Sequence, residues 1–126
     1  MYYPQTAFIV LDTSCNRRDI CAHCFYNVQP DRLTSDVMRT GEIIDVMKKL
    51  RLSGVSSVIF TGGEPLMRDD IVTLAGAASK LGMSVMLLTN GTLLDEEKLG
   101  LLIRAGVDSI VMSLVKLDEL ERRGAA

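Results

Sequence analysis

The sequence predicts an α/β fold in which parallel strands and helices alternate as a partial (βα) barrel of about four units. Apolar segments alternate with helical segments after residue 33, the first apolar segment shows no polar alternation, and glycines follow the helical segments. An open doubly wound sheet is the alternative. Because a complete barrel needs about 250 residues, the 126 residues of this chain predict a barrel that is truncated relative to the full one.

Four strands account for the apolar segments. The first candidate covers residues 7–11, an uninterrupted apolar run of the kind found in strands that are buried on both faces. The other three cover residues 57–61, 84–89 and 109–113. Helical segments between them favour right-handed crossovers within one parallel sheet.

Helices are predicted between the strands. Thr34 or Ser35 can cap the first helix, which places Ile43, Met47 and Leu50 on one apolar face. The third helix begins with the acidic residues 95–97, and residues 116–123 begin a fourth. The apolar positions of the second and third helices are Ile71, Leu74, Ala75, Ala78 and Leu81, and Leu99, Leu102 and Ile103. The glycines that end the first three helices are Gly54, Gly82 and Gly106.

A hydroxyl side chain stands at the end of three predicted strands. Thr61, Thr89 and Ser113 each follow a helix-ending glycine by seven residues. Because side chains alternate between the two faces of a strand, equal offsets predict that the three hydroxyls lie at similar height on the same face of the sheet. The alternative is that Ser and Thr are simply common at strand ends.

The charge balance and the apolar runs exclude several classes of protein. The net charge is −2, from 14 Lys and Arg against 16 Asp and Glu, whereas a nucleic-acid partner normally requires a basic face. No apolar run approaches the ~18 residues of a membrane helix, and residues 1–5 lack the features of a signal peptide. We therefore expect a cytoplasmic protein that binds neither nucleic acid nor membrane.

The three cysteines, Cys15, Cys21 and Cys24, lie within ten residues of one another. An odd number at this spacing is a poor disulfide framework and a better set of metal ligands. Three thiolates can hold three irons of a 4Fe–4S cluster and leave the fourth iron open. A zinc site that includes His23 and a redox pair of Cys21 and Cys24 are the alternatives.

The segment Gly62-Gly63-Glu64-Pro65 follows the second predicted strand. Glycines let backbone approach a ligand closely, and Pro65 suits the start of a helix. Carbonyl groups and the Glu64 carboxylate form a site for a cation such as an ammonium group, whereas the patterns of phosphate-binding loops are absent. The alternative is a tight turn without a ligand. The ends of parallel strands share one edge, so this loop, the cysteines, Thr89-Asn90 and Ser113 are expected at the same rim.

Together these motifs resemble the radical S-adenosylmethionine (SAM) superfamily, from about Ile9 to about Leu114. The resemblance implies one radical SAM core domain over residues 1–126, the N-terminal half of the barrel, with a cysteine loop at residues 13–33. It implies that the three cysteines ligate a 4Fe–4S cluster whose open iron binds the amino and carboxylate groups of SAM. The resemblance implies that SAM is contacted by His23 beside the adenine, by Gly62, Gly63, Glu64 and Pro65 at its amino group, by Thr89 and Asn90 near the nucleoside or substrate, and by Ser113.

The implied chemistry is electron transfer from the reduced cluster to SAM, which yields methionine and a 5′-deoxyadenosyl radical that removes a hydrogen atom from a substrate. The protein is therefore expected to be oxygen-sensitive and to need a reducing partner such as a ferredoxin or flavodoxin. The resemblance singles out no catalytic side chain. The chain departs from the family's commonest Cys-x3-Cys-x2-Cys spacing with Cys-x5-Cys-x2-Cys, and we retain Cys15 as the first ligand.

The motifs Gly-Gly-Glu-Pro-Leu and Thr-Asn-Gly-Thr resemble the branch that includes the GTP cyclase of molybdenum-cofactor synthesis and the maturases of peptides and haem-like cofactors. Ile59 occupies a position where the cyclase usually has Arg, so a maturase with an unknown substrate is favoured. The cyclase and a non-catalytic zinc or iron–sulfur module are the alternatives. Because the last barrel strands are missing, we expect a fragment of a longer protein, a truncated gene product, or an oligomer that covers the edge of the fourth strand.

Overall fold

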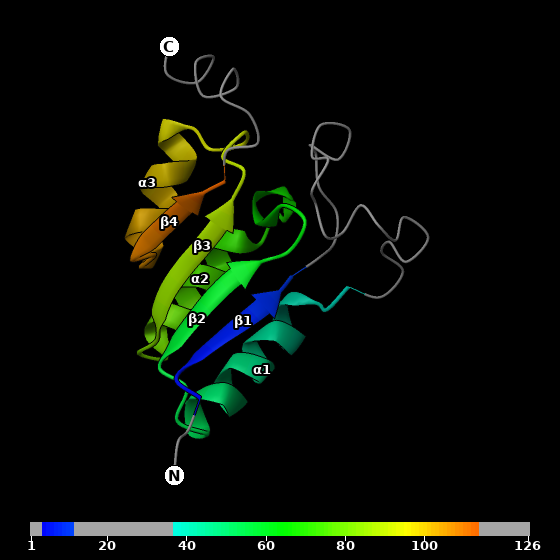
Figure 1. The fold of residues 1–126 in the computed structure, drawn as a ribbon, viewed down its shortest axis with the longest axis vertical. Coiled ribbons are helices and arrows are strands. Elements are labelled where there is room, and N and C mark those ends of the chain that lie inside the picture. Colours follow the sequence, from blue (N-terminus) through cyan, green and yellow to red (C-terminus); the bar gives the residue numbers. More distant parts are fainter. Residues whose placement is uncertain (1–3, 12–36, 114–126) are drawn as a thin grey trace.

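The computed structural model describes residues 4–11 and 37–113, which form one parallel sheet and its helices (Figure 1). The sheet has the strand order β1-β2-β3-β4, and every pair of neighbouring strands is parallel. The alternation of strands and helices confirms the predicted α/β class. In chain order the elements are β1 (Thr6–Val10), α1 (Thr40–Leu52), β2 (Ser57–Thr61), the 3₁₀ helix η3 (Pro65–Met67), α2 (Ile71–Lys80), β3 (Ser84–Thr89), α3 (Glu96–Ala105) and β4 (Ser109–Met112).

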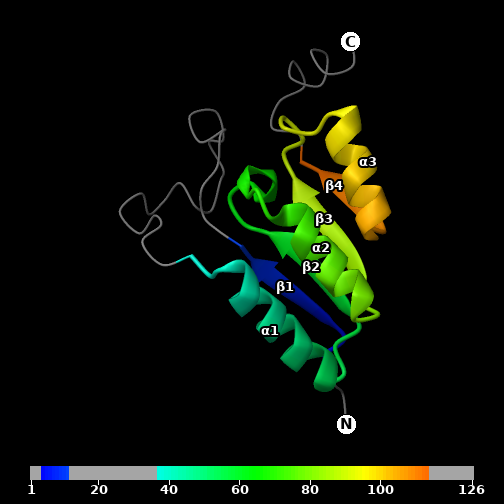
Figure 2. The same ribbon diagram turned by 180° about the vertical axis from the view of Figure 1, so that it is seen from behind.

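The helices α1, α2 and α3 cover the same face of the sheet, as the view from behind in Figure 2 shows. Strands in sequential order with every helix on one face form an unbroken series of right-handed crossovers. That arrangement is the wall of a βα barrel, whereas a doubly wound sheet carries helices on both faces. The predicted partial barrel is therefore confirmed for the four strands. The predicted helix that begins at residues 116–123 lies outside the described residues.

The hydrophobic core lies between the sheet and these helices. Its strand residues alternate along each strand, and its helix residues come from the predicted apolar faces. The opposite face of the sheet exposes Phe8 (64%), Val10 (44%) and Val111 (48%) among the described residues. The buried core includes Ile9, Val58, Phe60, Val85 and Leu87 from the strands, and Ile43, Met47, Ile71, Leu74, Ala75, Ala78 and Leu102 from the helices.

The first helix begins later than predicted. Arg39 is the N-cap of α1, and its backbone N–H donates to Oε2 of Glu42 at 3.2 Å. A glutamate three residues into a helix that accepts from the N-cap is half of a capping box, and it sets the start of the helix here. The predicted cap at Thr34 or Ser35, two residues that lie outside the described ranges, is therefore wrong.

The other helix boundaries follow the sequence signals. Asp95 is the N-cap of α3, and its Oδ1 accepts from the backbone N–H of Lys98 at 2.7 Å. Gly54 and Gly82 directly follow the C-caps of α1 and α2, and Gly106 is itself the C-cap of α3. All three adopt positive φ angles, which confirms their predicted role in ending the helices.

The strand register contradicts the prediction that three hydroxyls share one face. Phe60, Leu87 and Ile110 lie opposite one another, yet they follow Gly54, Gly82 and Gly106 by six, five and four residues. From β2 to β3 and from β3 to β4, the paired residue therefore lies one position closer to the preceding glycine. A closing barrel requires a stagger of this kind between neighbouring strands. Because one residue reverses the direction of a side chain, Thr89 lies on the helix-covered face, and Thr61 and Ser113 belong to the opposite one.

Candidate functional site at the carboxyl edge of the sheet

The four parallel strands end at the same edge of the sheet (Figure 1), which places Leu11, the loop after β2, the turn after β3 and Ser113 at this carboxyl edge. Backbone hydrogen bonds continue past the strand ends and hold these segments in place. The N–H of Leu11 donates to the carbonyl of Thr61 at 2.9 Å, and the N–H of Ser113 donates to the carbonyl of Thr89 at 3.0 Å. The predicted site residues within the described ranges therefore share one edge, where ligands bind in parallel α/β folds.

The loop from Gly62 to Pro65 connects β2 to η3. Gly62 has φ of +146°, a conformation open to glycine because it lacks a Cβ. The two glycines are half-buried, whereas Glu64 and Pro65 are buried. Glu64 is the N-cap of η3 and Pro65 is its first residue, an arrangement in which the missing N–H of proline costs nothing. The sequence thus forms a tight turn that leaves the glycine pair as its accessible part.

Glu64 joins this loop to the end of β3. Its Oε1 accepts from the backbone N–H of Leu66 at 3.0 Å and from the hydroxyl of Thr89 at 2.5 Å. Its Oε2 accepts from the backbone N–H of Asn90 at 2.7 Å. These donors occupy three of the about four acceptor positions of a carboxylate. In this structure Glu64 therefore links two loops, and its predicted contribution to a cation site stays a prediction.

Asn90 shapes the turn after β3. Its Oδ1 accepts from the backbone N–H of Thr92 at 2.9 Å and from the Thr92 hydroxyl at 2.7 Å. The N–H of Gly91 donates to Oγ1 of Thr89 at 3.0 Å. Such bonds between side chain and nearby backbone stabilise a specific turn. Together with Glu64 they hold the Thr89-Asn90 segment, of which Asn90 is only 7% exposed.

The remaining predicted site residues divide into two groups. Ser113 directly follows β4 and is exposed, so it is accessible at the carboxyl edge. Cys15, Cys21, Cys24 and His23 lie outside the described residues. Within residues 4–11 and 37–113, no three His, Cys, Asp or Glu side chains gather as a metal site. Along the chain, the cysteines follow Leu11, whose backbone lies beside Thr61 at the start of the glycine loop.

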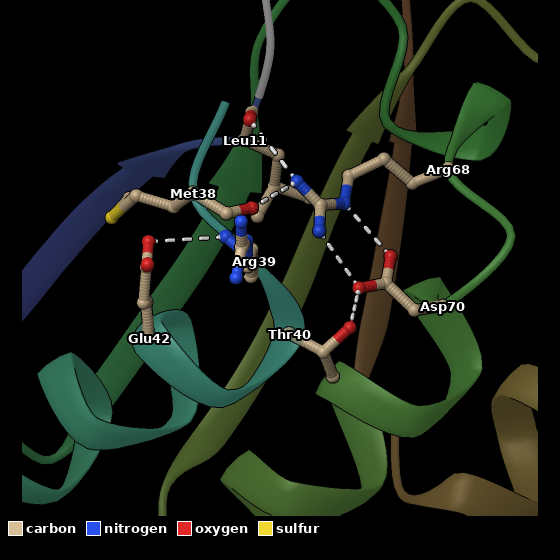
Figure 3. Close-up of polar contacts among 7 residues, drawn as sticks. All are labelled: Leu11, Met38, Arg39, Thr40, Glu42, Arg68 and Asp70. Atoms are coloured by element: carbon tan, nitrogen blue, oxygen red, sulfur yellow. Dashed lines mark hydrogen bonds and ion pairs between the residues drawn. The ribbon is translucent and has the colours of Figure 1, made fainter. Parts of the chain in front are cut away.

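Sequence reasoning missed a polar cluster beside the loop (Figure 3). Arg68 forms a bidentate ion pair with Asp70, with Nε–Oδ1 at 2.8 Å and Nη2–Oδ2 at 2.7 Å. The hydroxyl of Thr40 donates to Oδ2 of Asp70 at 2.5 Å. The hydrogen bond from Arg68 lowers the pKa of the Asp70 carboxyl below its usual value. An Arg and an Asp two residues apart after the Gly-Gly-Glu-Pro motif are the only sequence signal for this cluster, and they do not reveal the partners.

Similarity to known proteins identifies the family to which this fold, with its loops at the carboxyl edge of the sheet, belongs. A match to the radical SAM superfamily covers residues 9–124. The chain therefore belongs to the radical SAM superfamily, whose cofactors are a 4Fe–4S cluster and SAM. The family and the cofactor pair predicted for it are confirmed.

Among curated proteins, the chain is similar to PqqA peptide cyclases. It is 36% identical to the one from Gluconobacter oxydans (strain 621H) over 99 residues, which cover 79% of this chain and 27% of that protein. It is 39% identical to the one from Streptomyces rochei over 101 residues, which cover 76% of this chain and 27% of that protein. The chain thus spans about a quarter of the length of these relatives.

Solved structures share the fold. BtrN in complex with AdoMet and 2-DOIA superimposes with a TM-score of 0.77 at 20% identity, over 94% of this chain and 50% of that one. SuiB of Streptococcus suis bound to S-adenosylmethionine gives a TM-score of 0.77 at 25% identity, over 92% of this chain and 26% of SuiB. A structure of SuiB bound to the precursor peptide SuiA gives a TM-score of 0.75 at 26% identity, over 92% of this chain and 25% of that one.

Within the described part of the chain, no helix is long and apolar enough to cross a membrane.

Proposed function

We propose that this chain carries the cluster- and SAM-binding part of a radical SAM enzyme that modifies a peptide. The observation that carries the proposal is the Glu64 network, which fixes the glycine loop to Thr89 and Asn90 at the carboxyl edge of the sheet. A tight turn without a ligand needs no buried carboxylate shared between two loops, because burying a charge is costly. Membership of the superfamily supports the same function.

In this proposal Cys15, Cys21 and Cys24 hold the cluster, and His23 lies beside the adenine of SAM. The loop Gly62-Gly63-Glu64-Pro65 receives the amino group of SAM, Thr89 and Asn90 lie near the nucleoside or substrate, and Ser113 contacts SAM from the end of the fourth strand. When bound, the cluster and SAM supply the electron and the 5′-deoxyadenosyl radical for hydrogen abstraction.

The contribution of the described residues is to hold the site in one shape. The Glu64 carboxylate keeps the glycine loop and the Thr89-Asn90 turn at a fixed separation through three hydrogen bonds. Both oxygens are buried, and a network of satisfied buried polar groups is rigid. Pre-organised loops bind a ligand without a further loss of loop entropy, which favours a single orientation of SAM.

A peptide is the substrate class that we propose. The relatives are named PqqA peptide cyclases, and SuiB was crystallised with the precursor peptide SuiA. These similarities favour a peptide maturase over a GTP cyclase. A cytoplasmic setting and a reducing partner such as a ferredoxin or flavodoxin belong to the same proposal, because the chemistry needs a low-potential electron and intact thiolates. Assembly into an oligomer, or with the remainder of a barrel, also belongs to it, because β4 ends the sheet formed by the described residues.

The test is anaerobic reconstitution of the chain with iron and sulfide, followed by addition of SAM and dithionite. The proposal predicts about four irons per chain and the appearance of 5′-deoxyadenosine in the wild type, and loss of both in Cys21→Ala. Calorimetry with SAM distinguishes the proposed enzyme from the alternative of a non-catalytic metal module. Tightly held metal without affinity for SAM would contradict the proposed function.

A further inference from the structure

The Arg68–Asp70 pair joins three parts of the chain at the carboxyl edge (Figure 3). Besides its ion pair with Asp70, Arg68 donates from Nη1 to the carbonyl of Met38 at 3.0 Å and to the carbonyl of Leu11 at 3.4 Å. Asp70 in turn accepts the hydroxyl of Thr40 at 2.5 Å. We refer to Arg68, Asp70 and Thr40, together with the carbonyls of Leu11 and Met38, as the clasp.

The two carbonyl groups of the clasp come from either side of the stretch that contains the cysteines. Leu11 directly precedes residues 12–36, and Met38 lies two residues after them. This stretch contains Cys15, Cys21 and Cys24, the proposed cluster ligands. One guanidinium group therefore binds the carbonyl groups of two residues that flank the cysteine-bearing stretch. The same guanidinium is attached to the turn that follows the glycine loop and η3.

The chemistry of the pair suits a fixed link. Arg68 and Asp70 are only 13% and 21% exposed, so water screens their attraction weakly. A planar guanidinium that binds a carboxylate with two nitrogens fixes direction as well as distance, and a lysine cannot reproduce this geometry. The clasp thus limits the separation of the two ends of the stretch before any ligand binds, which lowers the entropy cost of bringing its residues together.

We propose that Arg68 and Asp70 are positioning residues that hold both ends of the cysteine-bearing stretch in register with the glycine loop. This inference rests on the proposed function, because the clasp acts on residues that we assign to the cluster. It predicts that the clasp slows loss of the cluster and improves binding of SAM beside it, without contact between Arg68 and either cofactor.

The test compares Arg68→Lys, Asp70→Asn and the milder Thr40→Val with a matched control, Arg51→Lys. Arg51 also connects two helices through a backbone carbonyl, since its Nε donates to the carbonyl of Leu81 at 3.1 Å. However, this bond lies at the C-terminal ends of α1 and α2, at the opposite edge of the sheet. A general loss of packing would affect the control as much as the clasp variants.

The first readout is peptide-resolved hydrogen exchange of the chain without iron. Arg68→Lys is expected to speed exchange in residues 9–11 and 37–41 by about tenfold, the effect of removing a charge-assisted hydrogen bond from a locally closed segment. Arg51→Lys should leave these peptides unchanged. Equal exchange in the wild type and Arg68→Lys would overturn the inference even if no cluster were assembled.

The second readout uses the reconstituted chain. Arg68→Lys and Asp70→Asn should release iron to a chelator about tenfold faster than the wild type, the lower end of the effect of losing a group that orients metal ligands. The change that SAM causes in the electron paramagnetic resonance spectrum of the reduced cluster should require more SAM. Thr40→Val should shift both measurements in the same direction by a smaller amount.

The outcomes separate the two proposals. If the wild type shows no spectral response to SAM, the proposed function fails. If the wild type responds and the clasp variants match Arg51→Lys in iron release and in the SAM response, the positioning role alone is overturned.

Discussion

Glu64 is a charged side chain with only 2% of its surface exposed. A buried carboxylate is tolerated when hydrogen-bond donors replace its lost water, and Leu66, Thr89 and Asn90 supply them here. Two of these partners lie 25 and 26 residues further along the chain. The carboxylate therefore contributes to stability and to the shape of the site at the same time.

Glu64→Gln should destabilise the chain despite its nearly identical shape. Both carboxylate oxygens accept from backbone N–H groups, and the amide of glutamine must present its NH₂ group to one of these donors. One buried N–H then loses its partner, at a cost of about 1–3 kcal/mol in the free energy of unfolding. Urea unfolding measures the effect, and the exposed Glu97→Gln serves as control, with a change below about 0.5 kcal/mol. Equal stability of both variants would show that Glu64 is not the link that we describe.

Asp70→Asn should reveal a pH-dependent contribution to stability. The hydrogen bond from Arg68 is the main reason why the pKa of Asp70 lies below the usual 3.8. A carboxyl group whose pKa is lowered by folding stabilises the native state above its unfolded pKa, and this contribution disappears as the pH falls through the folded pKa. The stability difference between wild type and Asp70→Asn should therefore be largest at neutral pH and shrink below about pH 4. A difference that is constant or grows in acid, in urea titrations across this range, would contradict this origin.

At the scale of the elements, the junction between α2 and α3 is tightly packed. Gly106 ends α3 with φ of +109°, and a Cβ at this position would lie 2.6 Å from the Cβ of Ser79 in α2 and closer still to its hydroxyl oxygen. Gly54 ends α1 with a similar φ of +97°, but no atom lies within 4 Å of its Cβ position. A substitution at Gly54 therefore measures the free-energy cost of the left-handed backbone alone, whereas one at Gly106 adds the cost of overlap with Ser79.

Gly106→Ala should destabilise the chain more than Gly54→Ala. Both substitutions force an alanine into a left-handed conformation at about 1–2 kcal/mol, and only Gly106→Ala adds an overlap worth about 1–3 kcal/mol. In the Ser79→Gly background the extra cost of Gly106→Ala should fall, which a double-mutant cycle of urea unfolding measures. Equal costs for Gly54→Ala and Gly106→Ala would show that the helices separate without penalty.

At the scale of the whole molecule, local signals predict the elements better than their relative placement. The observed β2 and β3 have the predicted bounds, because each apolar run is flanked by Ser or Thr and bordered by glycine. The start of α1 was missed, because Arg39 is not a usual N-cap residue. The helix begins there because Glu42 accepts a hydrogen bond from the backbone N–H of Arg39. The equal spacing from the helix-ending glycines also failed to predict the faces of Thr61, Thr89 and Ser113. Neighbouring strands are staggered by one residue, and this stagger belongs to the geometry of the barrel and not to the local sequence.

The candidate site was predictable to a similar extent. The Gly-Gly-Glu-Pro and Thr-Asn-Gly motifs were expected at one edge, and the structure brings them together through Glu64. The direction of the Glu64 carboxylate was not predictable, because it depends on contacts with a distant strand. The clasp was missed for the same reason, since its carbonyl acceptors at Leu11 and Met38 carry no sequence signature.

The central claim is that the three cysteines hold a cluster whose open iron faces SAM bound at the glycine loop. Electron–nuclear double resonance of the reduced, reconstituted chain with SAM labelled with ¹⁵N in its amino group tests this claim most directly. We predict a hyperfine coupling from the amino nitrogen in the wild type and its loss in Cys21→Ala. A reduced 4Fe–4S cluster in the wild type that shows no coupling to saturating labelled SAM would contradict the account.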